Sequence, residues 1–190
     1  MKKWMSIPLL LLIFLATSCG GKKESIRIMQ LRIDSMQTAL NELSTEKKNT
    51  KTHLKRFDSL DFQFYNNQQW EQFNLSNHDG ITVFYPDGGL SLGLPTHIDN
   101  LKQLFAYAPD TKIINHRVAF GGDDWTAVVS EIQGTFTDTM STPDGKVHLP
   151  TNKPFKFMTC TVAHWQNGKM MDKYLFWDNH AFMKQIGIIQ

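Results

Sequence analysis

The sequence predicts an α+β protein in which an antiparallel sheet follows several helices. Three features indicate this class. Residues 51–110 carry apolar side chains mostly at helical spacing. From residue 112 onward the period changes to two, as strands require. Turn-forming residues at 121–124 and 166–168 then join neighbouring strands as hairpins.

Composition limits the classes of function. The 190 residues are 41% hydrophobic and 20% charged, which suits one globular domain with appendages. A net charge of +2, without a basic cluster among aromatics, gives no reason to expect a nucleic-acid partner. The histidines show no metal-site spacing, and the sequence lacks a phosphate-binding glycine loop. We therefore expect no metal and no cofactor.

Residues 1–18 have the pattern of a bacterial signal peptide. Lys2 and Lys3 precede an apolar run at 7–15, which is too short for a permanent membrane span. Small residues then lead into Cys19, and the run LATSCG resembles a lipobox. The expected product is a lipoprotein held in the cell envelope, at the outer membrane, by acyl chains such as palmitate on Cys19. An ordinary cleaved signal with an incidental cysteine is the alternative.

The pattern of side chains in residues 19–50 predicts a helical spacer. Six apolar residues recur at steps of three and four, the a/d pattern of a coiled coil: Ile26, Met29, Ile33, Met36, Leu40 and Leu43. The stripe breaks at Lys47 and Thr50. Both a single spacer helix and a short coiled coil that pairs two chains remain open, because three heptads are marginal for pairing.

The globular domain is expected at residues 51–190, beginning with helices. Its first helix is predicted by a stripe at helical steps: Leu54, Phe57, Leu60, Asp61 and Phe64. Trp70 and Phe73 indicate a second short helix, and residues 81–85 a short strand. A further helix is expected after Pro95, with Thr96 as its N-cap.

Four long strands and a terminal helix complete the domain. The strands are predicted at 113–120, 125–137, 155–165 and 169–177. Within the last strand, Asp172, Tyr174 and Phe176 share one face, while Lys173, Leu175 and Trp177 share the other. If the first face lines a cavity, Asp172 is the best-placed ionisable group of the chain.

The order PTNK, strand, GKMMDKY and helix ending in KQIG resembles the SnoaL-like polyketide cyclase (ester cyclase) family of the nuclear transport factor 2-like superfamily. Ala108-Pro109-Asp110 and Gly134-Thr135-Phe136 fit its pattern as well. The resemblance covers about residues 54–188. It implies a bent antiparallel sheet wrapped by three to four helices around a conical pocket, and a homodimer formed through the sheet's outer face.

The resemblance also implies site residues. In the family, an acidic residue of the pocket acts as general acid/base, and Asp172 keeps the acidic character of its position. His164 is the second catalytic candidate, and four further residues are expected to line the ligand: His116, Glu131, Tyr174 and Phe176. Each has a structural alternative, such as an ion pair or a hydrogen-bonded core position. Phe136 and Lys173 stand where the family has histidine, which weakens the case for an enzyme.

The sequence is therefore consistent with two main functions. The favoured one is a membrane-anchored lipoprotein that binds a small apolar ligand in a conical pocket. The alternative is a cofactor-independent cyclase, isomerase or lyase that uses a pocket carboxylate. A scaffold that only forms homodimers is a third possibility.

Overall fold

The computed structural model describes residues 10–142 and 145–190, with side chains from residue 21 onward. Part of the predicted signal peptide, residues 1–9, and the side chain of Cys19 lie outside the described residues. The chain divides into two compact units, one that ends at Thr45 and one that comprises Glu46–Gln190. Among the described helices, none combines the length and apolar character needed to cross a lipid bilayer.

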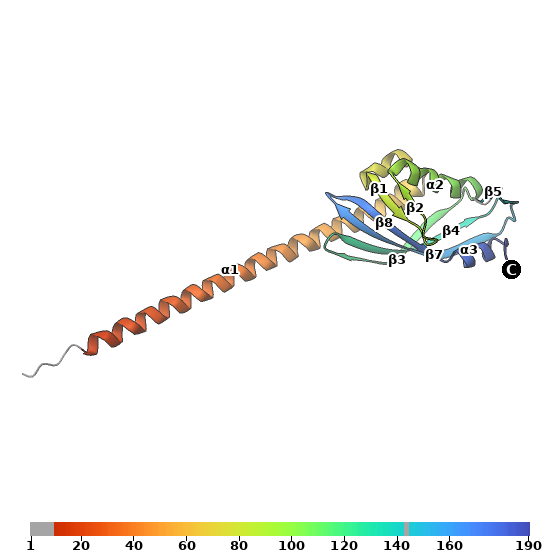
Figure 1. Cartoon of the computed structure of the whole chain (residues 1–190). Coiled ribbons are helices and arrows are strands. Elements are labelled where there is room, and N and C mark those ends of the chain that lie inside the picture. Colours follow the sequence, from red (N-terminus) through yellow and green to blue (C-terminus); the bar gives the residue numbers. More distant parts are fainter. Residues whose placement is uncertain (1–9, 143–144) are drawn as a thin grey trace, which may run out of the picture. The chain divides into compact units, whose positions relative to one another are not determined.

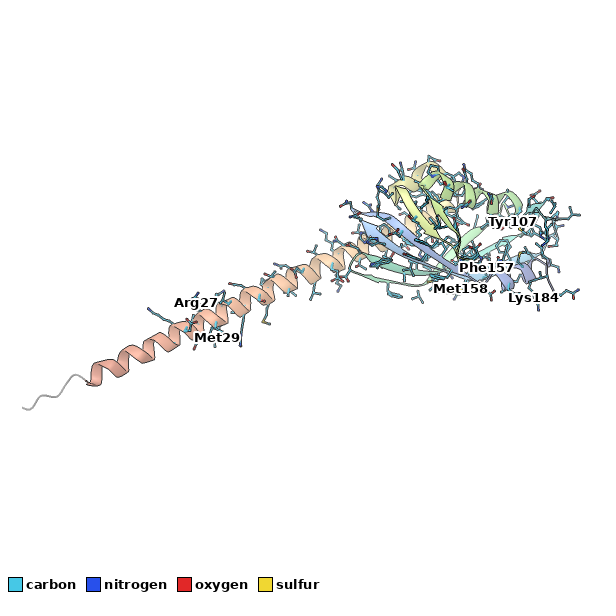
Figure 2. The ribbon with its side chains drawn as sticks, in the orientation of Figure 1. Arg27, Met29, Tyr107, Phe157, Met158 and Lys184 are labelled. Carbon is cyan, nitrogen blue, oxygen red and sulfur yellow. The ribbon has the colours of Figure 1, made fainter. Side chains whose placement is uncertain are left out.

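The first unit consists of helix α1 up to Thr45, and α1 runs over Leu10–Asp58 in all. Helix α1 therefore covers the whole of the predicted helical spacer, residues 19–50, and continues through Lys47 and Thr50 without a break. Its apolar stripe is exposed, with Met36 showing 72% of its surface. Figure 2 shows Arg27 and Met29 extending from this helix. Pairing of two chains along the stripe stays a prediction.

The second unit is built on a six-stranded sheet in the order β2-β1-β8-β7-β4-β3 (Figure 1). The strands are β1 Asn77–Phe84, β2 Leu90–Leu92, β3 Lys112–Gly122, β4 Trp125–Thr135, β7 Pro154–Gln166 and β8 Lys169–Trp177. All neighbours are antiparallel except β1 and β8, which are parallel. The α+β class is confirmed, but the sheet is mixed. The short strands β5 Met140–Ser141 and β6 Val147–His148 form a separate pair.

The helical elements pack mainly through aromatic and aliphatic side chains on one face of the sheet. They are the π-helix η1 Ser59–Tyr65, the 3₁₀ helix η2 Trp70–Leu75, α2 Leu94–Tyr107 and α3 Asn179–Gln185. Helix α2 begins at Leu94, after Gly93 with φ of 83°, and not at the predicted Thr96 cap. The Asp178 carboxylate caps α3 by accepting a hydrogen bond from Ala181 N at 2.8 Å.

The main core lies between these helices and the sheet. Trp165 is fully buried at its centre, stacks on His53 with ring centroids 4.5 Å apart, and donates from Nε1 to Thr126 Oγ1 at 2.8 Å. Burial of such large side chains supplies most of the favourable free energy of folding. A second cluster at the α3 end contains Phe136 and Phe155. Phe136, where the family pattern has histidine, is therefore a core residue here.

A β-bulge in β8 decides which residues of that strand face the helices. His164 of β7 lies opposite Asp172, whereas the next residue, Trp165, lies opposite Met170. Strand β8 therefore contains one extra residue at Met171. Met170 and Lys173 are both buried, although simple alternation from Met170 would bury Asp172 instead.

Candidate functional site

A cavity of about 910 Å³ lies within the second unit, between the helices and the inward face of the sheet. Its walls are mainly apolar, and their side chains come chiefly from η1, η2, α2 and strands β4, β7 and β8, including Leu60, Phe73, Leu101, Leu104, Ile132 and Leu175. Figure 2 labels two further lining residues, Tyr107 at the end of α2 and Phe157 on β7. Burial raises the pKa of Tyr107 to about 12, so its hydroxyl stays protonated.

A small set of polar side chains interrupts the apolar wall. The set includes Asp61, Tyr85, His97, Asn100, Thr161 and Lys173. Asn100 Nδ2 donates to the Tyr85 hydroxyl at 2.9 Å, and that hydroxyl lies 3.2 Å from Ser91 Oγ. These contacts fix the orientation of the Tyr85 ring at the cavity wall.

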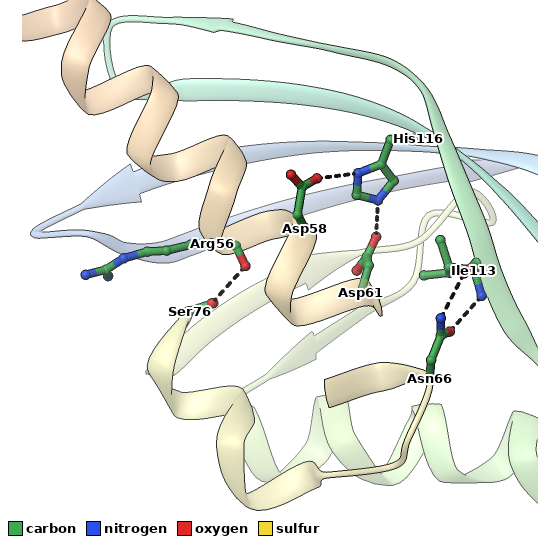
Figure 3. A network of polar contacts seen from close by, with 7 residues as sticks. All are labelled: Arg56, Asp58, Asp61, Asn66, Ser76, Ile113 and His116. Atoms are coloured by element: carbon green, nitrogen blue, oxygen red, sulfur yellow. Dashed lines mark hydrogen bonds and ion pairs between the residues drawn. The ribbon is translucent and has the colours of Figure 1, made fainter. Parts of the chain in front are cut away.

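The carboxylate of Asp61 reaches the cavity from η1 and is held by His116 of β3 (Figure 3). His116 Nε2 lies 2.9 Å from Asp61 Oδ2, and His116 Nδ1 lies 2.8 Å from Asp58 Oδ1. Asn66 joins η1 to the same strand, because its side chain both donates to and accepts from the Ile113 backbone at 2.8 Å.

The two carboxylates change the titration of His116. Burial lowers its pKa, but the hydrogen bond and charge of Asp61, followed by those of Asp58, outweigh this effect and raise it overall. In the charged imidazolium both ring nitrogens donate, so each bonds one carboxylate. The result is a charge-assisted Asp–His–Asp arrangement with one carboxylate at the cavity.

Lys173 and His97 are buried ionisable residues at the cavity wall. Lys173 is 5% exposed, and burial lowers the pKa of its amine to about 8 despite the opposing effect of Asp61. Burial, followed by the charge of Lys173, lowers the pKa of His97 well below its usual range. His97 is therefore a neutral imidazole, and its Nδ1 has no hydrogen-bond partner among the described residues.

The family model for the SnoaL-like polyketide cyclases matches residues 58–186 of this chain. The chain belongs to that family. The family assignment made from the sequence motifs is thus confirmed, whereas lipid attachment stays a prediction. Against curated proteins, the sequence finds no match.

Solved structures of the family share the fold of the second unit. A candidate SnoaL-like polyketide cyclase of Jannaschia sp. CCS1 is 13% identical, with a TM-score of 0.64 over 74% of this chain and 95% of its own. The candidate polyketide cyclase IdmH of Streptomyces antibioticus is 14% identical, with a TM-score of 0.61 over 71% and 98%. A SnoaL-like polyketide cyclase of Agrobacterium tumefaciens is 18% identical, with a TM-score of 0.52 over 66% and 91%. At these identities the likeness shows the fold alone.

In this SnoaL-like chain the predicted pair Asp172 and His164 lies on the outer face, the sheet face opposite the cavity. The two residues do come together, with His164 Nδ1 3.1 Å from Asp172 Oδ2, but each side chain is about one-third exposed. Trp125 stacks on His164 with centroids 4.8 Å apart. The expectation that the Asp172 face lines the cavity is corrected, because the bulge in β8 turns Lys173 inward instead. A catalytic role of this pair stays a prediction.

The other predicted ligand-binding residues lie outside the cavity lining as well. Tyr174 stacks on Phe84 at 4.5 Å on the outer face, and Phe176 is half exposed there. The Glu131 carboxylate is paired with Lys156 and Arg117, whose hydrogen bonds lower its pKa. His116 does not line the cavity itself but contacts two residues that do, Asp61 and Phe57.

The polar residues that do line the cavity were not singled out from the sequence. Asp61 interrupts an otherwise apolar helical stripe, and Lys173 shares a strand face with Leu175 and Trp177. A charged residue on an apolar face is the sequence feature that could have identified both. His97 carried no such indication. Across residues 10–142 and 145–190, no group of His, Cys, Asp and Glu is arranged to hold a metal ion.

Proposed function

We propose that the chain is a lipid-anchored envelope protein that binds a small, largely apolar molecule in the cavity of Glu46–Gln190. The observation that carries this proposal is the cavity itself, of about 910 Å³ with apolar walls and few polar groups. Small-molecule sites typically have this size and composition. The polar residues at its wall would orient a ligand that has one polar end.

The anchor rests on the sequence around Cys19. Each buried methylene of an acyl chain contributes about 0.8 kcal/mol, so several chains on one cysteine hold a protein stably at a membrane. We expect the wild-type protein in the membrane fraction and Cys19→Ser in the soluble fraction. If the N-terminal peptide of the exported protein has the mass of an unlipidated, uncleaved chain, the proposed lipid anchor is refuted.

Ligand binding is tested with Nile red, a neutral apolar fluorophore. Thr159 lines the cavity, whereas the preceding residue, Met158, is 45% exposed on the outer face. Thr159→Phe should fill part of the cavity and weaken Nile red binding about tenfold, as expected for about 1.4 kcal/mol. Met158→Phe is the matched control and should bind as the wild type does. Equal affinity in all three proteins would refute binding in the cavity.

A cofactor-independent cyclase, isomerase or lyase is the second candidate. It is favoured by the Asp61 carboxylate, which reaches the cavity and is oriented by His116. A carboxylate held in this way can move a proton next to a carbonyl group. The test is the exchange of α-hydrogens of 2-tetralone for deuterium, followed by NMR. The activity is supported if the wild type and Asp172→Asn exchange hydrogens faster than buffer alone and Asp61→Asn does not. A wild-type rate equal to that of buffer excludes the activity for this probe.

Self-association through the outer face remains a proposal as well. One cross-strand row on that face is apolar and continuous, and it consists of Val118, Val129, Cys160 and Phe176. Val118 and Phe176 are about half exposed. Light scattering should give twice the mass of one chain, and Phe176→Asp should halve it. A wild-type protein that is monomeric at high concentration would contradict the proposal.

A further inference from the structure

The Lys173 amine lies at the cavity wall, and none of the described residues forms an ion pair with it. Lys173 lies in the middle of β8, opposite Val83 of β1 and Ala163 of β7, both fully buried. Within the described part of the chain its amine has no hydrogen bond or ion pair. Lysine is rarely buried without such a partner, because the charged form loses its hydration. The position therefore needs an explanation other than stability.

Burial favours the neutral amine. With a pKa of about 8, about one Lys173 amine in ten is uncharged at pH 7. For an exposed lysine the fraction is below about one in a thousand. A neutral amine has a free electron pair and attacks carbonyl carbon, whereas an ammonium group does not.

The surroundings of Lys173 suit such a reaction. The charge of the Asp61 carboxylate acts on the Lys173 amine, and both residues line the cavity, so a candidate proton acceptor lies at the same site. His97 is a neutral imidazole at the same wall, with one ring nitrogen free of hydrogen bonds among the described residues. The walls of the cavity are mainly apolar, and an apolar ligand that fills it would displace water, which favours condensation over hydrolysis.

We propose that Lys173 forms a reversible Schiff base with an aldehyde or ketone group of the ligand, an inference that rests on the proposed binding in the cavity. The nitrogen electron pair attacks the carbonyl carbon, the nitrogen gives up one proton and the carbonyl oxygen takes up one, which yields a neutral carbinolamine. Loss of the hydroxyl group together with the remaining N–H proton then releases one water and leaves a C=N bond. The step needs no oxidant or reductant.

The test uses 2-naphthaldehyde, an apolar aldehyde, with sodium cyanoborohydride to reduce the imine to a stable amine. Mass spectrometry of the intact protein and of its peptides reports how much adduct forms and on which lysine. At about pH 7 we expect one adduct per chain, located at Lys173, at aldehyde concentrations that leave other lysines unmodified. Lys173→Met should lose this adduct. Lys112→Met, which removes an exposed lysine of β3, should keep it.

The outcomes separate this inference from the proposed function. Adducts spread over exposed lysines, with Lys173 unmodified in the peptide map, would overturn the Schiff base. If the same wild-type sample still bound Nile red, ligand binding would stand by itself. If it bound neither Nile red nor the aldehyde, the proposed function would fail as well. The peptide map of the wild type decides the point even if Lys173→Met does not fold.

Discussion

Replacing Lys173 by methionine should stabilise the protein at neutral pH. The pKa of Lys173 falls from 10.5 to about 8 because the amine is buried. The folded state therefore binds fewer protons than the unfolded state between these pH values, and the free energy of unfolding rises with pH across this range. Below pH 8 the protein carries the full cost of the buried charge, about 3 kcal/mol. Methionine has a similar length and no charge, so Lys173→Met should recover up to that amount.

The assay is urea unfolding of wild type and Lys173→Met at about pH 7 and about pH 10. The variant should be more stable at the lower pH, and the difference should shrink at the higher pH, where the wild-type amine is neutral. Lys112→Met removes a charge from an exposed position and should change stability by less than about 0.5 kcal/mol at both. A variant less stable than the wild type at pH 7, or a difference that does not vary with pH, would refute the reasoning.

Three further predictions concern the hydrogen bonds of His116 to Asp58 and Asp61, the packing around Gly134, and Asp172 on the outer face. His116→Asn should lower stability by about 1–3 kcal/mol at pH 6. Because the pKa of His116 is raised in the folded state, the variant should lose the most stability below about pH 6.5. The difference from wild type should shrink as pH rises through the pKa of His116 in the folded protein. Urea unfolding of both proteins at about pH 6 and about pH 9 would check this. Gly134→Ala would place a Cβ 2.6 Å from Phe155 Cζ and should cost about 1–3 kcal/mol, whereas Gly80→Ala meets only ordinary contacts and should not. Equal melting temperatures for the two alanine variants would contradict this packing. Asp172→Asn should leave Nile red affinity within about twofold of wild type, since Asp172 lies outside the cavity lining; a tenfold loss would place it in the site.

Much of the fold was predictable because local periodicity and turn chemistry agree along most of the chain. The hairpin at Asn167-Gly168 has positive φ at both residues, as the sequence indicated. The parallel pairing of β1 with β8 was not predictable, because it joins segments about ninety residues apart and depends on the whole sheet. The same holds for η1, where a π-helix brings Asp61 beside His116.

The site residues predicted on β8 share that strand with residues that line the cavity but lie on its other face. Alternation in β8 separates Asp172, Tyr174 and Phe176 from Lys173, Leu175 and Trp177, and that division holds. One extra residue opposite β7 then decides which set faces inward, and no local pattern marks it.

By itself, the sequence determined the α+β class and the two alternating sets of side chains, because these follow from spacing along the chain, and the order of its motifs identified the family. Only the tertiary structure decided which set lines the cavity. The pairing of β8 with β7, including the bulge at Met171, is a property of two strands together. Because of this pairing, Lys173 and not Asp172 lines the cavity, and the chemistry available there is that of an amine.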